Sequence, residues 1–132
     1  MYNELLDKIK NDLSVIKNND ILIFDKVTKG ATKSDDDLNV ASIFLANSNH
    51  GQLTSRRYET EPTINLVCIF NKKRDDLSQN ELFLQRKYSD IEVIEDYFKQ
   101  NFVLTNTEFS EDNNGLYVMI TFKTSEVKAI WV

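Results

Sequence analysis

The sequence has few of the residues that usually carry chemistry. Its 132 residues include one cysteine, one histidine, one tryptophan, one proline and three glycines. A single cysteine cannot form an internal disulfide, which fits a reducing compartment. The three glycines stand far apart, so neither the G-x-G-x-x-G loop nor the P-loop occurs. The sequence therefore predicts no cofactor.

Long apolar runs and an excess of positive charge are also missing. No run approaches the ~20 apolar residues needed to span a bilayer. Residues 1–4 have neither the basic region nor the apolar core of a secretion signal. The net charge is −5, which opposes non-specific nucleic-acid binding because that binding needs a cationic face. We expect no membrane insertion, no direct nucleic-acid specificity and synthesis in the cytoplasm.

The apolar residues that are present suffice for one core. They make up 41% of the chain, charged residues make up 28%, and the length is typical of one domain. We predict a single domain over residues 1–132, with a core in 1–125 and a C-terminal extension in 126–132.

Apolar spacing predicts the elements of the first half. Residues 3–17 form an amphipathic helix, with Leu5, Ile9 and Leu13 on one stripe. A short strand at 21–24, a loop at 26–37, a central strand at 38–46 and a second loop at 47–52 follow. Residues 53–70 read as one long strand broken near Pro62, because proline cannot donate a ladder hydrogen bond. Its first half is polar and its second half apolar.

The second half contains two S-x-x-E capping boxes, Ser78 with Glu81 and Ser89 with Glu92. They predict two short helices, from about Gln79 and from about Asp90. Residues 102–109 and 116–122 predict a hairpin, whose connector ends in Asn-Gly, a pair that favours positive φ. The predicted fold is α+β, with one mostly antiparallel or mixed sheet, an N-terminal helix and a helical segment before the C-terminal hairpin.

No group of residues has the spacing of a catalytic or metal site. His50 lies in a predicted polar loop and Cys68 in an apolar run, so a Cys-His pair is not expected. Asp35–Asp37 lack the spacing of a calcium loop and read as solvated charge. We predict no catalytic residues, no metal and no enzyme activity.

The remaining candidates are residues of an interface. Basic clusters flank the predicted long strand, and they are read either as solvated charge or as electrostatic contacts with an acidic neighbour. Trp131 either closes the core or enters a neighbouring molecule. The candidate interface residues are Arg56, Arg57, Tyr58, Glu59, Lys72, Lys73, Arg74 and Trp131.

The order of these elements resembles the tail terminator proteins of long-tailed phages. The resemblance extends from about residue 3 to 124 and concerns length, element order and hydrophobic pattern. The segments that carry it are Glu4–Leu13, Leu38–Leu45, Pro62–Phe70 and Gly115–Phe122. The extension at Val127–Val132 and the split helix depart from the family's pattern.

The resemblance implies a ring, typically a homohexamer, in the tail or neck of a virion or phage-like particle. Such a ring caps the tail tube, stops its polymerisation and forms the joining surface to the head connector, the sheath or a collar. It implies no cofactor and no catalysis. The polar segment 53–61 would then project to the subunit boundary, because rings need a heterologous interface that closes by rotation.

Three other classes remain open. One is another head-tail adaptor or tail completion protein. A second is a small binding or immunity-type protein of a mobile element. The third is a small enzyme, which would need a pocket with convergent polar groups.

Overall fold

The computed structural model describes residues 2–30, 38–55, 57–73, 80–124 and 126–129. Ten elements follow one another: α1 (Tyr2–Ser14), β1 (Lys17–Asn18), β2 (Ile21–Leu22), β3 (Lys26–Lys29), β4 (Val40–Thr54), β5 (Arg57–Asn71), α2 (Asn80–Asn101), β6 (Val103–Glu111), β7 (Gly115–Lys123) and β8 (Glu126–Ala129). The main sheet has the order β3-β4-β5-β7-β6, and β8 also pairs with β5. Among the strand pairs of the described residues in this sheet, only β3–β4 is parallel. The predicted α+β class with a mostly antiparallel mixed sheet is confirmed.

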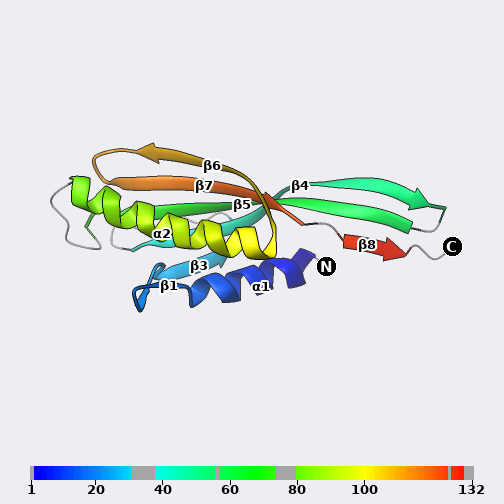
Figure 1. Ribbon diagram of the computed structural model, residues 1–132, viewed down its shortest axis with the longest axis horizontal. Coiled ribbons are helices and arrows are strands. Elements are labelled where there is room, and N and C mark those ends of the chain that lie inside the picture. The colour runs from blue at the N-terminus through cyan, green and yellow to red at the C-terminus, as the bar shows by residue number, and fades with distance from the viewer. Residues whose placement is uncertain (1, 31–37, 56, 74–79, 125, 130–132) are drawn as a thin grey trace.

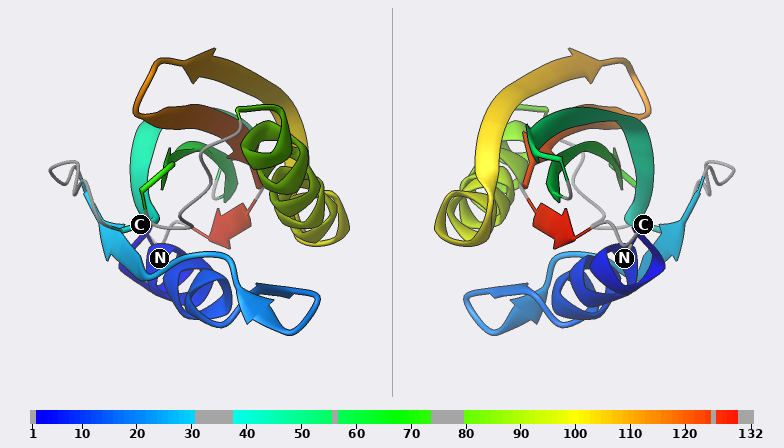
Figure 2. Two further views of the ribbon diagram at one scale, coloured as in Figure 1. Left: turned by 90° about the vertical axis from the view of Figure 1, so that its left-hand side faces the viewer. Right: turned by 90° about the vertical axis from the view of Figure 1, so that its right-hand side faces the viewer.

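The core lies between the sheet and the two helices. The sheet is strongly curved, and α1 and α2 lie on its concave side (Figure 2). Alternate residues of β5 and β7 face the helices and are fully buried, as the period of a strand requires. At the centre, the rings of Phe98 from α2 and Phe122 from β7 stack with centroids 4.0 Å apart.

The N-terminal segment folds as a helix followed by a tiny hairpin. The helix predicted for residues 3–17 ends at Ser14, and β1 pairs with β2 across a two-residue turn. Asn19 and Asp20 both have positive φ, 53° and 64°, which is the backbone of a type I′ turn. The strand predicted for 21–24 is therefore only two residues long.

The loop predicted for residues 26–37 is wrong in its first part. Residues 26–29 form β3, which runs parallel to residues 40–43 of β4. Val27 is the one apolar side chain of β3 and is buried in the core. One apolar residue gives no periodicity, so this strand depends on its partner. Residues 31–37, which include the predicted acidic loop Asp35–Asp37, lie outside the described part of the chain.

The largest departure from prediction is a long hairpin made by β4 and β5, each of 15 residues. The loop predicted for 47–52 is strand, and Pro62 does not interrupt β5. Pro62 lies where the neighbour of β5 changes from β7 to β8, and its carbonyl accepts from the Thr124 N–H. Because the N–H and C=O of a strand residue point to the same side, the missing N–H faces this gap in the pairing.

The two predicted short helices are one continuous helix of 22 residues, α2. The predicted start at Asp90 is wrong because residues 80–101 contain no proline or glycine and keep one buried stripe. Ser89 therefore does not cap a helix; its Oγ lies 3.0 Å from Nδ2 of Asn18, which donates to it. The predicted departure from the tail terminator pattern at a split helix is thus absent.

The predicted C-terminal hairpin is confirmed as β6 and β7, but its turn differs from the prediction. Neither Asn114 nor Gly115 has positive φ. The Asp112 carboxylate instead accepts from the N–H groups of Asn114 at 2.7 Å and Gly115 at 3.1 Å. The hydrogen bond from Asn114 is the main reason that the pKa of Asp112 is lowered. Asx-type bonding thus makes the turn.

Gly115 is required by close packing. A Cβ built there would overlap the Phe70 carbonyl oxygen, whereas a Cβ at Gly51 would meet nothing within 4 Å. We expect Gly115→Ala to lower the free energy of unfolding by about 1–3 kcal/mol or more. Gly51→Ala, the matched control, should change it by less than about 0.5 kcal/mol. Urea unfolding followed by circular dichroism checks both, and equal effects would contradict this account.

Candidate functional site

The outer part of the β4–β5 hairpin projects beyond the body of the molecule (Figure 1). We call it the arm: residues 47–54 of β4 and 57–62 of β5. It begins at a bulge between Leu45 and Asn47. Along β4 of the arm every side chain but Ser48 is exposed, and Leu53 is 52% exposed. Along β5 of the arm, Thr60 and Pro62 are buried. The β4 strand of the arm therefore has backbone pairing while most of its side chains face solvent.

The two long edges of the arm differ. On one side, β8 pairs with residues 57–60 of β5. On the other side, β3 reaches only Ile43 of β4, so among the described residues no strand lies along residues 44–53. An edge strand of this length presents unpaired N–H and C=O groups to another chain.

The hydrogen-bond pattern identifies the groups on this open edge. The Gly30 N–H donates to the Ile43 carbonyl at 2.7 Å, so odd residues of β4 face outward before the bulge. The bulge at Ala46 shifts the alternation by one residue. The backbone N–H groups of Ser48, His50 and Gln52 therefore face the open edge.

The structure separates the two predicted basic clusters. Arg57 is exposed at the tip of the arm, whereas Lys72 and Lys73 follow the opposite end of β5. About 15 residues of strand, roughly 50 Å, lie between them. The Lys72 Nζ donates to the Asp112 carbonyl at 3.4 Å and lies over the Phe83 ring. Lys72 thus supports the β6–β7 turn, and of the cluster residues that the structure describes, only Arg57 belongs to the arm.

The other predicted interface residues are only partly described. Glu59 is half-buried in the arm opposite Val127 of β8, and the backbone of Tyr58 pairs with Lys128. Arg56, Arg74 and Trp131 lie outside the described residues.

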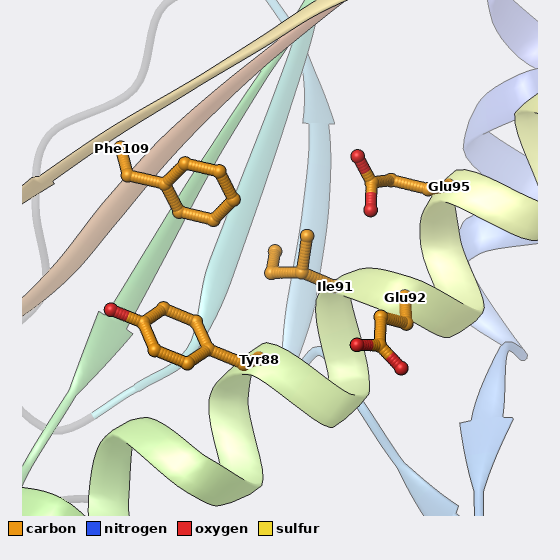
Figure 3. A pocket seen from close by; sticks show the side chains of 5 residues that line it. All are labelled: Tyr88, Ile91, Glu92, Glu95 and Phe109. Atoms are coloured by element: carbon orange, nitrogen blue, oxygen red, sulfur yellow. The ribbon is translucent and has the colours of Figure 1, made fainter.

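A hollow that sequence reasoning missed lies between α2 and β6 (Figure 3). Its volume is about 470 Å³, and it is lined by Tyr88, Ile91, Glu92, Glu95 and Phe109. The Tyr88 and Phe109 rings meet edge to face with centroids 5.9 Å apart. They are nevertheless 43% and 51% exposed, which is unusual for two large aromatic side chains in contact.

The two carboxylates of the hollow differ in their contacts. Glu95 accepts a hydrogen bond from the Thr107 hydroxyl at 2.8 Å, which ties α2 to β6. Glu92 is exposed and makes no ion pair with any described residue. Once residues 80–101 are read as one helix, Tyr88, Ile91, Glu92 and Glu95 share a stripe at i, i+3, i+4 and i+7. The split-helix prediction concealed that signal.

The structure keeps His50 and Cys68 apart. His50 pairs with Thr60, whereas Cys68 pairs with Ala41, so nine residues of β4, roughly 30 Å, separate them. His50 lies in a strand and not in the predicted loop, and its Nδ1 is 3.2 Å from the Thr60 hydroxyl. Burial raises the pKa of the Cys68 thiol far above its ordinary value, so the thiol stays protonated.

The described residues contain no group of three or more histidine, cysteine or acidic side chains placed to hold a metal ion. Neither α1 nor α2, the helices of the described chain, is long and apolar enough to cross a membrane. Comparison of the chain with protein-family models and with curated proteins gives no match.

Burial makes a prediction for Cys68. In the native protein its alkylation by iodoacetamide at pH 8 should be at least about a hundredfold slower than in urea, because only a small unfolded fraction exposes the thiol. The thiol introduced by Val15→Cys, at an exposed residue outside the arm and 68% accessible, is the control and should react at the rate of an unfolded cysteine. Equal rates for the two thiols, measured by mass spectrometry, would contradict the buried position.

Proposed function

We propose that this chain is a structural assembly protein of the tail terminator type. Its copies form a ring, typically of six, on the end of a tail tube. The ring stops polymerisation of the tube and presents a surface to the head connector, sheath or collar. The observation that carries the proposal is the open β4 edge of the arm.

A long open edge is a liability for a monomer. Such an edge can pair with any exposed strand, and monomeric proteins usually shorten it, cover it or place charges on it. Here the described edge over residues 44–53 carries no aspartate, glutamate, lysine or arginine. This favours pairing with another chain as the role of the edge.

The shape of the subunit also supports a closed assembly. The arm leaves the body on one side only (Figure 1), so a contact between the arm of one copy and the body of the next uses different surfaces on the two molecules. Such a heterologous contact closes into a ring when the rotation between copies divides a full turn. The partners in this proposal are other copies of the chain, the tube protein, and the head connector or sheath.

The proposed role depends on surfaces and not on a reaction. The ring would act by covering the growing end of the tube, so no catalytic residue and no cofactor take part. The place of the protein would be the tail or neck of a virion or phage-like particle.

The first test is the mass of the purified protein, alone and with tube protein. We expect light scattering to give several times 15.4 kDa, and electron microscopy of tubes assembled with the protein to show capped tubes of limited length. Assembly only in the presence of tubes would also support the proposal. A protein that stays single at high concentration and leaves tube growth unchanged would overturn it.

The second test blocks the open edge. His50→Pro removes one outward N–H from the arm, and proline is tolerated on an edge. We expect this variant to keep its circular dichroism spectrum and to lose most of its assembly. His50→Thr is the matched control, since it removes the same imidazole but keeps the N–H. Equal assembly of both folded variants would show that the open edge is not the contact.

A further inference from the structure

We propose that the arm of one copy adds to the outer edge of β6 in the next copy and covers the hollow beside α2. This inference rests on the proposed function, because it names the surface that receives the arm. The interface would join Leu53 and Arg57 of the arm to Tyr88, Glu92 and Phe109 of the hollow.

The receiving edge lies beside the hollow. Among the described strands, β6 pairs only with β7, so β6 is an outer strand of the sheet. The sheet curves from β6 toward α2 (Figure 2), and the hollow occupies the space between them. A strand added to β6 would extend the sheet over this space and bury the exposed Tyr88 and Phe109 rings.

The chemistry of the two surfaces is complementary. The hollow offers an apolar floor from Tyr88, Ile91 and Phe109, with the Glu92 and Glu95 carboxylates at one side. The tip of the arm carries an exposed apolar side chain, Leu53, and an exposed cation, Arg57, whose guanidinium makes no ion pair with a described residue. An apolar anchor beside an ion pair is a typical arrangement at an interface centre.

The positions of the two surfaces prevent a subunit from filling its own hollow. The tip of the arm lies at one end of the molecule, and the β6–β7 turn and the start of α2 lie toward the other end (Figure 1). Phe109 lies near the end of β6 that leads into the β6–β7 turn, and Tyr88 lies in the first half of α2. The arm therefore reaches the hollow of a second copy only.

A charge exchange between Arg57 and Glu92 tests the contact. Glu92 is preferred to Glu95 because Glu95 also holds Thr107. We expect Arg57→Glu and Glu92→Arg each to raise the concentration needed for assembly by about tenfold or more, since each variant places like charges together. The double variant should return to within about threefold of the original protein. Light scattering over a range of protein concentrations measures all four.

The control for this test is Glu81→Arg. Glu81 is exposed in the first turn of the same helix but does not line the hollow. Glu81→Arg changes the net charge by the same amount as Glu92→Arg. It should leave assembly unchanged. An assembly that forms normally in all variants would overturn the inference and leave the proposed ring intact. Single variants that fail without rescue in the double variant would also overturn it.

Crosslinking gives an independent readout. Leu53→Cys together with Tyr88→Cys should, on mild oxidation, give disulfide-linked multimers on a non-reducing gel, whereas either substitution alone should give at most a dimer. A series of bands that ends at a fixed number of copies would support this contact within a closed ring. A double variant whose linked species do not exceed the dimer given by a single variant would contradict the arm-to-hollow contact, as would the absence of any crosslink in an assembled sample.

Discussion

The ladder between β4 and β5 is the interaction on which the rest of the structure depends. Its inner half is the centre of the sheet, where β5 also pairs with β7 and buries Leu66, Cys68 and Phe70 against the helices. In its outer half the backbone pairing continues, but the β4 side chains are exposed apart from Ser48, whose Oγ accepts a hydrogen bond from the Tyr2 hydroxyl of α1. Because the inner half is anchored by the core, the outer half is held in register and carried away from the body as an arm.

At the opposite edge of the sheet, the body leaves part of α2 uncovered beside β6. The helix α2 packs on the sheet through Phe83, Ile91, Ile94 and Phe98, but the sheet ends at β6 before it has curved far enough to cover the next stripe of the helix. Tyr88 and Phe109 remain exposed there. The arm has a strand edge without a neighbour, and the edge of β6 has room for one more strand. The proposed head-to-tail contact joins these two edges.

Much of the fold could be predicted from periodicity. The α1 stripe, the apolar half of β5 and the β6–β7 hairpin carry their own pattern, and the structure confirms them. The predictions failed where a local sequence signal disagreed with the strand or helix that packs against the segment in the folded chain. Residues 47–52 look like a loop, yet they form strand because β5 lies opposite. Ser89 looks like a cap, yet the buried stripe continues through it. The hollow escaped prediction because its residues come from α2 and β6, which are brought together only by folding.

The sequence by itself determined the class of the fold and the residues of its core, because burial of apolar side chains follows their spacing along each element. It also determined that the polar segment before residue 62 could not belong to that core. Tertiary structure alone decided that this segment joins β4 in an arm, that one edge of the arm stays open and that a hollow forms beside β6. Those features depend on which backbones lie next to one another, and backbone groups are the same in every residue but proline.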